Sequence, residues 1–462
     1  MMRSIPSRYI RVGVQLTLLV ALLAFVARAA HAQDAAARPP ADSTTTLTLS
    51  LGDAMRLAAR QNLIVTSART RVEVAASRVT QRRADLLPTI AGLASERRAT
   101  LNSAAAFPIE LPAAGIDPRG SVLGPLDVFD ARARVTQSLF DPAARARIAS
   151  ARTNVSAASA DVAQSSDIAA TQAALAYLAV LRADAVYGAR VQDSSLAAEL
   201  LRIARDQLSA GTGVALDVTR ARSQLTVART QLITSRNERG RTRIDLARTL
   251  ALPSADLVLS DTLGTLPLRS ASTDSSAMDA ALRTRKDVQS LALQAVAARQ
   301  QGRSIGKESQ PTVGVVADYG VSQRNGRSYL PTYGVGVQLT APIFDGRRRE
   351  GRMAEQEAVA RDLEARTRDL QAQVVADVRI ALLNLASSTE VVAAARERLG
   401  LAEQEVAQSR ERFQAGVAGN ADVITASIQL NNARTQLVDA LTSYEAARIA
   451  LARAEGIISA LD

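Results

Sequence analysis

The side chains able to do chemistry in this sequence are almost all carboxylates. The chain has one histidine, His31, and no cysteine or tryptophan. Zinc sites, thiol nucleophiles and serine–histidine triads need histidine or cysteine. Hydrolysis by carboxylates alone stays possible, but no pair of acids departs from the surface pattern of amphipathic helices. We therefore expect no enzyme, no cofactor and no metal centre.

Two of these carboxylates lie in matching segments. Residues 211–232 recur 205 residues later as residues 416–437, and both copies open on glycine and contain the same Ala-Arg-Thr-Gln-Leu string. Asp217 in the first copy corresponds to Asp422 in the second. Chance similarity between alanine-rich helices does not hold such a set in register, so the chain is predicted to be duplicated.

The segments around this repeat are duplicated in the same order. Leu139-Phe140-Asp141 corresponds to Ile343-Phe344-Asp345, and Pro88-Thr89 corresponds to Pro311-Thr312. Each half is expected to run helix, strand, loop, strand, very long helix, tight turn, helix. The predicted halves are residues 47–252 and 277–456, with a Ser-, Asp- and Pro-rich linker at 253–276 and a tail at 457–462.

The first 32 residues are predicted to be a secretory signal peptide. A basic start with Arg3, Arg8 and Arg11 precedes the apolar stretch Val12–Val26, and small residues end the segment at Ala32. The alternative is a membrane anchor, but this stretch is short for a span of about 20 residues. A flexible segment at 33–46 is expected to follow.

The charge of the remaining chain favours solvated helices over nucleic-acid binding. Without the leader it has 52 basic and 45 acidic residues, a net charge of +7. Arginine is scattered at helical intervals and aromatics are 3% of residues, whereas nucleic-acid sites cluster both. No unbroken apolar run after the leader reaches the roughly 18 residues of a membrane helix, so we expect no helical span.

Alternating residues predict four strands. The clearest are 312–322 and 333–340, where Val, Ala and Tyr alternate with polar residues and glycine. A third runs over 129–136, and a weaker one starts near Thr89. Such two-faced strands are required by a membrane barrel and are also typical of a soluble hairpin. The connecting loops are expected at 102–127 and 324–330.

The predicted helices are unusually long. Residues 142–210 and 347–415 contain no proline after the first position, and about 70 residues of helix measure roughly 100 Å. Asp141 and Asp345 are expected to cap their starts, and Gly211 and Gly416 to end them. Shorter helices are predicted at 51–86 and 214–252, and the last helix shows heptads typical of close-packed coiled coils.

Four strands cannot close a membrane barrel, which needs about eight or more, and lipid does not tolerate an open sheet edge. The chain is therefore expected to lend its strands to an oligomer. The predicted fold class is mainly α with a small β part: a long α-helical barrel continuous with a transmembrane β-barrel built from four strands per protomer.

The order of these elements, the Phe-Asp strand ends and the paired Gly…Asp-Val turns resemble the TolC-like outer-membrane efflux protein family over about residues 47–456. The resemblance implies a homotrimeric exit duct of an efflux pump or a type I secretion system. It implies an outer-membrane location extending into the periplasm. A periplasmic adaptor, an inner-membrane transporter and outer-membrane lipid would be its partners.

The resemblance also implies roles for single residues. Asp422 matches the position that lines the periplasmic aperture, Asp217 its partner, and three copies of Asp422 would form a cation-favouring ring; alternatively both acids only favour a helix start. The tip turns and the barrel-to-helix junction complete the implied sites. The tip residues are Gly211, Gly213, Gly416, Gly419, Phe413 and Thr425; the junction residues are Phe140, Asp141, Phe344 and Asp345.

Three tip positions depart from the family pattern. Phe413 replaces a tyrosine, Ala418 an arginine and Thr425 an aspartate, so the closed state is expected to be held less firmly or by different contacts. The alternative function is a periplasmic coiled-coil adaptor or scaffold, which explains the helices but leaves the strands without a role.

Overall fold

The computed structural model describes residues 47–102, 122–252, 257–266, 275–324, 326–415, 417 and 419–458. The predicted signal peptide at 1–32, the segment at 33–46 and residues 459–462 of the predicted tail lie outside this part of the chain. The described residues are mostly helical, with one four-stranded and one two-stranded sheet.

Two helices of more than 65 residues dominate the structure. Helix α5 is Pro142–Ser209 and α9 is Arg348–Gln414, close to the predicted bounds. Asp141 caps α5 by accepting from the Ala144 N–H at 2.8 Å, with Pro142 as the first helical residue. The analogous prediction for α9 is wrong, because its N-cap is Arg347.

The shorter helices extend along α5 and α9. Helices α6 (Ala215–Thr249) and α10 (Asn420–Ala454) follow the tight turns. The single helix predicted over 51–86 is instead two, α2 (Leu51–Gln61) and α3 (Leu63–Ala84). Asn62 breaks it, because its side-chain oxygen caps the Ile64 N–H and its amide donates to the Thr249 carbonyl.

A similar break divides the helix that precedes the second strand pair. Helix α7 (Ser275–Thr284) ends at Arg285, and α8 (Lys286–Gly306) begins directly after it. The Thr284 hydroxyl donates to the Glu455 carbonyl at 2.7 Å, which fixes the break to the end of α10. A short 3₁₀ turn, η2 (Lys307–Ser309), ends α8.

The four predicted strands form one antiparallel sheet in the order β2-β3-β5-β6. Their bounds are β2 Thr89–Asn102, β3 Val122–Phe140, β5 Thr312–Arg324 and β6 Leu330–Thr340. Strand β3 starts earlier than predicted, inside the expected 102–127 loop. The register pairs Tyr319 with Tyr333 and Ala317 with Val335, and the β6 members of this apolar face are between 68% and 82% exposed.

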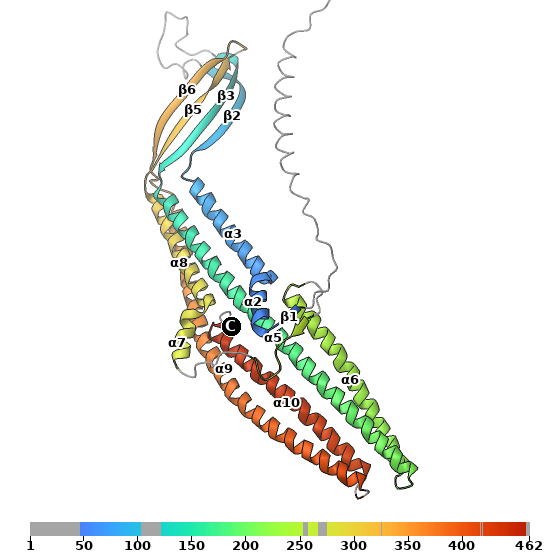
Figure 1. Cartoon of the computed structure of the whole chain (residues 1–462). Helices are drawn as coiled ribbons and strands as arrows, with labels where there is room; N and C mark the ends of the chain where they lie inside the picture. Colours follow the sequence, from blue (N-terminus) through green and yellow to red (C-terminus); the bar gives the residue numbers. More distant parts are fainter. Residues whose placement is uncertain are drawn as a thin grey trace, which may run out of the picture. The chain divides into compact units, whose positions relative to one another are not determined.

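The helices pack in two rows that share α5 and α9. On the sheet side the contacts run α3–α5–α8–α9, and on the other side they run α6–α5–α10–α9. Figure 1 shows the sheet at one end of these helices and the α5–α6 and α9–α10 turns at the other. In each row, α9 therefore lies at one margin and α3 or α6 at the opposite margin. In the sheet, β6 and β2 are the two edge strands in the same way.

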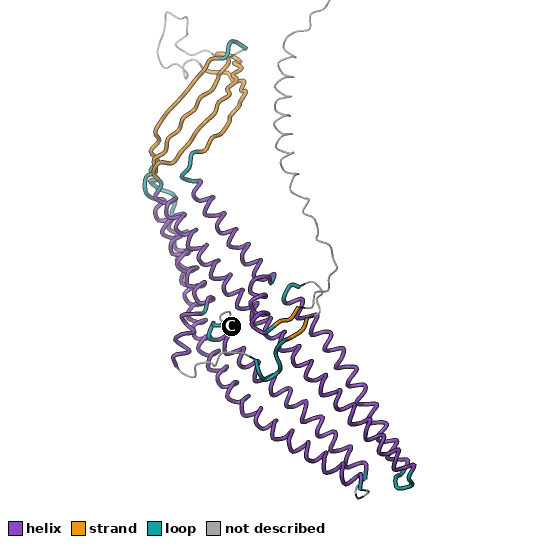
Figure 2. Tube along the Cα trace, viewed as in Figure 1, coloured by secondary structure: helices purple, strands orange, loops and turns teal. Residues whose placement is uncertain are grey.

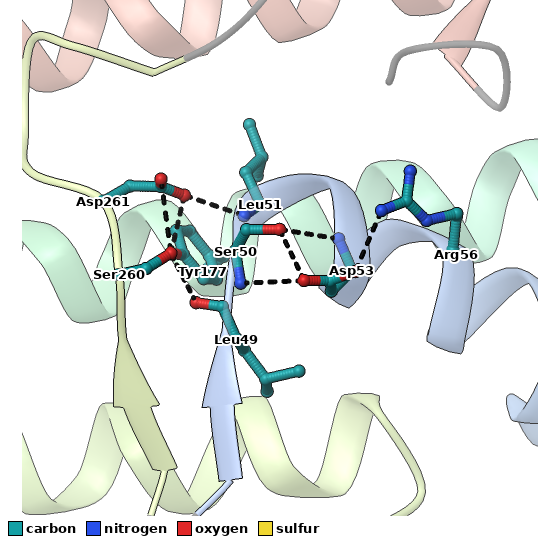
Figure 3. A network of polar contacts seen from close by, with 8 residues as sticks. All are labelled: Leu49, Ser50, Leu51, Asp53, Arg56, Tyr177, Ser260 and Asp261. Carbon is teal, nitrogen blue, oxygen red and sulfur yellow. Dashed lines mark hydrogen bonds and ion pairs between the residues drawn. The ribbon is translucent and has the colours of Figure 1, made fainter.

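A second, two-stranded sheet lies beside the middle of α5 (Figure 2). Strand β1 (Leu47–Leu49) pairs in parallel with β4 (Leu257–Leu259) from the predicted linker. Figure 3 shows the polar network that fixes this pair: the single proton of the buried Tyr177 hydroxyl is shared between the Leu49 carbonyl, 3.0 Å away, and the Asp261 carboxylate, 2.8 Å away. Apolar residues of α2, α5, α6 and α10 surround it.

One helix among the described residues, α9, contains a stretch long and apolar enough to cross a membrane by length and composition alone. This differs from the sequence expectation, which required an unbroken apolar run. Because α9 packs along α8 and α10, we interpret it as a member of the two helix rows and not as a membrane span.

Candidate functional site at the hairpin tips

The α5–α6 turn is a compact Schellman motif. Helix α5 ends, and Gly211 adopts a left-handed φ of 77°. The Thr212 N–H donates to the Gln207 carbonyl and the Gly211 N–H to the Leu208 carbonyl. A Cβ on Gly213 would lie 3.0 Å from Gln207 Cβ. Glycine is therefore required at both predicted positions of this turn.

The α9–α10 turn follows the same pattern where it is described. The Val417 N–H donates to the Arg412 carbonyl at 3.0 Å, the bond expected across a glycine-ended helix. Gly416 and Ala418 lie outside the described residues. Gly419 is the N-cap of α10, with open space around its Cβ position.

Asp217 and Asp422 occupy equivalent positions, the third residue of α6 and of α10. Both therefore lie in a first helical turn, where a carboxylate is favoured by the helix dipole. Asp217 is partly buried and lies 3.9 Å from Arg220. Asp422 is exposed, and its carboxylate makes no ion pair within the part of the chain that the structure describes.

The two tips are tied to each other by two hydrogen bonds that use main-chain acceptors. The Asn420 side-chain amide donates to the Asp217 carbonyl at 2.9 Å. The Gln207 side-chain amide donates to the Phe413 carbonyl, also at 2.9 Å. Hence α6 is joined to α10 and α5 to α9. Arg410 and Glu199 add an ion pair between α9 and α5 just above the tips.

Phe413 anchors the same region by packing. Its ring is 3% exposed and contacts Leu200 and Ile203 of α5 and Val423 of α10. An apolar ring therefore occupies the place where the resemblance implies a hydroxyl. Thr425 makes no such link: its exposed hydroxyl donates to the Ala421 carbonyl of its own helix.

A buried charged cluster joins α5 and α10 further from the tips. Asp193, whose side chain is fully buried, pairs with Arg434 at 3.0 Å and with Arg190 at 3.1 Å. Oriented to donate, the Asn431 amide also binds Asp193. Burial raises the pKa of the Asp193 carboxyl, although both arginines oppose the shift.

Sequence reasoning missed the residues that join the hairpins. Asn420 and Arg434 are two heptads apart on α10, and Asp193 and Gln207 are two heptads apart on α5. Polar residues at a heptad seam fix the register of packed helices. That spacing is the feature of the sequence from which these contacts could have been predicted.

The predicted junction residues lie where the strands meet the helices. Phe140 is half-exposed at the end of β3, and Asp141 also pairs with Arg147 at 3.2 Å. Phe344 is 83% exposed. Asp345 does not cap α9 as predicted, because Gly346 and Arg347 follow it with positive φ; its carboxylate instead accepts from the Arg349 N–H at 3.2 Å.

The described residues contain no group of three or more acidic, His or Cys side chains that could hold a metal ion. The arrangement at the tips can hold two helical hairpins together, and it presents an unpaired carboxylate beside the contact.

Comparison with known proteins gives consistent results. A family model described as outer membrane efflux protein matches residues 54–252 and 277–456. No curated protein sequence matches the chain significantly.

Solved structures with the same fold cover nearly the whole chain. The Campylobacter jejuni CmeC outer membrane channel is 16% identical with a TM-score of 0.72, covering 91% of this chain and 94% of that one. Vibrio cholerae VceC is 18% identical with a TM-score of 0.70, covering 88% and 96%. The open Neisseria gonorrhoeae MtrE channel is 16% identical with a TM-score of 0.69, covering 90% and 93%.

Proposed function

The chain belongs to the outer membrane efflux protein family, and from this we propose that it is the exit duct of a tripartite efflux pump or of a type I secretion system. Its place is the outer membrane, with an extension into the periplasm. The observation that carries the proposal is the four-stranded sheet with an exposed apolar face, continuous with helices of 68 and 67 residues.

The free margins of the chain support assembly into a homotrimer. Among the described strands, β2 on one side of the sheet and β6 on the other keep unpaired edges, which lipid does not tolerate. Three copies joined β6 to β2 would give twelve strands, an even number within the range of membrane barrels. In the same ring α9 of one copy would meet α3 and α6 of the next.

We further propose that the halves 47–252 and 277–456 are duplicated units on either side of the 253–276 linker. In support, each half contains a broken helix, two strands, a very long helix and a 35-residue helix in that order. Both 35-residue helices end in a left-handed residue, Ala251 and Gly456.

The tips are proposed to form the periplasmic aperture. The three-fold axis would bring the exposed Asp422 carboxylates of three copies together, a ring that favours cations. The links from Asn420 and Gln207 would set how far the two hairpins of one copy can separate.

A periplasmic adaptor and an inner-membrane transporter are the proposed partners. The tip turns expose Val214, Leu216 and Val417, a small apolar surface that is typical of a docking site. The transporter would supply energy and select the cargo.

Cysteine cross-linking tests the trimer directly, because the chain has no cysteine of its own. Ala94→Cys on β2 would be combined with a cysteine at Tyr333, Val335 or Val337 on β6. Oxidation in outer membranes is expected to give a ladder that ends at three copies for at least one pair. The control is Ala94→Cys with Ala131→Cys, which are paired within one chain and should give no ladder.

Conductance completes the test. The purified trimer is expected to pass ions across a planar lipid bilayer. Material that stays monomeric, fractionates as a soluble periplasmic protein and passes no ions would overturn the channel and favour the adaptor or scaffold.

A further inference from the structure

Exposed apolar side chains gather where the sheet meets the helices. Ile343 and Phe344 are 96% and 83% exposed, and Leu87, Leu139 and Phe140 are also exposed. They follow β6, precede β2 and end β3. We call these five residues the apolar belt.

Six basic residues lie one step further toward the helices. Each lies within about two helical turns of the strand ends, on α3, α5, η2 or the start of α9, and each is exposed. We call them the basic collar: Arg82, Arg83, Arg145, Lys307, Arg347 and Arg348.

The acids at this level are largely occupied by other arginines. Arg147 pairs with Asp85 and Asp141. Arg349 pairs with Asp345, and Arg352 with Glu308. Across the described ranges the basic collar has no ion pair, and Glu350 is the exposed acid that remains beside it.

For three of the six collar residues, a favourable interaction with a helix end does not explain the positive charge. Arg145, Arg347 and Arg348 lie at the N-terminal ends of α5 and α9, where the helix dipole disfavours a cation. Arg347 also adopts a left-handed φ of 66°, which is uncommon for a residue other than glycine. The helix dipole therefore does not account for the positive charge at these three positions.

One contact shows that collar and belt share a side of the sheet. The Arg145 guanidinium carbon lies 5.9 Å from the centre of the Phe140 ring. Phe140 pairs with Val313, whose register partner Leu339 continues the exposed apolar face of β6. Aromatic and aliphatic groups next to long cations are the pattern of a membrane–water interface, because the cation reaches the headgroups from an apolar base.

We propose that the basic collar binds the phosphate groups of anionic phospholipids in the leaflet that faces the periplasm. The apolar belt then lies among the acyl chains, and the two layers together fix the depth of the channel. This inference rests on the proposed membrane insertion of the sheet. The attraction is electrostatic and short-ranged, so it acts on lipids in contact with the collar.

Lipid retention tests the proposal. Purified trimer would be reconstituted with an equal mixture of phosphatidylcholine and phosphatidylglycerol, and the retained lipids counted by native mass spectrometry. The wild type is expected to enrich phosphatidylglycerol. In the variant with all six collar residues changed to Gln, the enrichment of phosphatidylglycerol should be about tenfold lower than in the wild type. Because six changes could impair insertion, R145Q/K307Q provides a milder variant expected to lose part of it.

The matched control changes six other exposed arginines that lack ion pairs in the described part of the chain. They lie on α6 and the far half of α9: Arg222, Arg229, Arg236, Arg396, Arg398 and Arg412. This variant has the same change in net charge and should retain phosphatidylglycerol like the wild type.

Two results would overturn the inference: equal retention by the collar variants and the wild type, or equal loss in the control. Displacement of the lipid by inorganic phosphate alone would assign the collar to free anions instead. Normal conductance without lipid preference would remove only this inference, whereas a monomer without conductance would remove the channel itself.

Discussion

The side-chain amide of Asn420 donates a 2.9 Å hydrogen bond to the main-chain carbonyl of Asp217. Asn420 is fully buried, and its own side-chain oxygen has no partner among the described residues. The contact between the tips therefore uses the NH2 group of the Asn420 side chain and not its oxygen. An apolar residue would fit the surrounding apolar seam without a buried polar group.

Asn420→Ala is expected to loosen the tips. Loss of the bond removes a link between α6 and α10, at a cost of about 0.5–1.5 kcal/mol. In planar bilayers the variant should open more often or conduct more than the wild type. Thr425→Ala is the control, since that hydroxyl bonds only within its own helix. Identical traces for all three proteins would assign the bond to stability alone.

Phe413→Ala should destabilise the α9–α10 tip locally. Truncating a buried phenylalanine costs about 3–5 kcal/mol, and this ring bridges α5 and α10. Hydrogen exchange of the amides around Arg412 and Val423 is expected to accelerate strongly. Phe344→Ala, which removes a mostly exposed ring, should leave that exchange unchanged.

Asp422→Ala tests the proposed aperture. Removing three exposed carboxylates should lower the preference for cations over anions and weaken block by divalent cations. Glu411→Ala is the matched control, an exposed acid on α9 near the same turn. Unaltered selectivity and block in the Asp422 variant would leave the acid with a helix-start role only.

Asp193→Asn should remove part of the pH dependence of stability. Burial raises the folded-state pKa of Asp193 above its ordinary 3.8, so the folded chain binds this proton more tightly than the unfolded chain. The contribution is full below pH 3.8 and is lost as pH rises through the folded pKa. Arg190, Arg434 and Asn431 face the carboxyl and are unchanged in the variant.

The measurement is thermal unfolding of wild type and Asp193→Asn from neutral pH down to about pH 4. The wild type is expected to gain stability relative to the variant as the pH falls. Asp206→Asn, an exposed acid paired with Arg202, serves as the control. A constant difference between wild type and Asp193→Asn over this range would contradict the prediction.

Most of the architecture was predictable from the periodicity of apolar residues and from the residues that start and end helices. The Asp141-Pro142 start of α5, its glycine-ended tip and the alternation of β5 and β6 all follow from local chemistry that acts within a few residues. The breaks at Asn62 and Arg285 were not predictable in that way. They involve neither proline nor glycine and depend on bonds to Thr249 and Glu455, which lie far away in the chain.

The site was less predictable than the fold. The sequence drew attention to Asp217 and Asp422 because they repeat, yet the contacts between hairpins use Asn420, Gln207 and the ring of Phe413. The hydrogen bonds of Gln207 and Asn420 are accepted by main-chain carbonyls. Every residue type has such a carbonyl, so the sequence does not indicate which one accepts. Asp345 failed as a cap because Gly346 and Arg347 turn the chain before α9 can start.

The parallel pairing of β1 with β4 determines when the amino-terminal part of the chain can complete its folding. Leu51 binds Asp261 across 210 residues, so the first described segment of the chain is synthesised well before the strand that completes it. Until then β1 lacks the strand with which it pairs, and the Leu51 N–H lacks its acceptor. A nascent chain stalled before Leu257 should therefore remain protease-sensitive at its amino end, however much of α5 has already left the inner membrane.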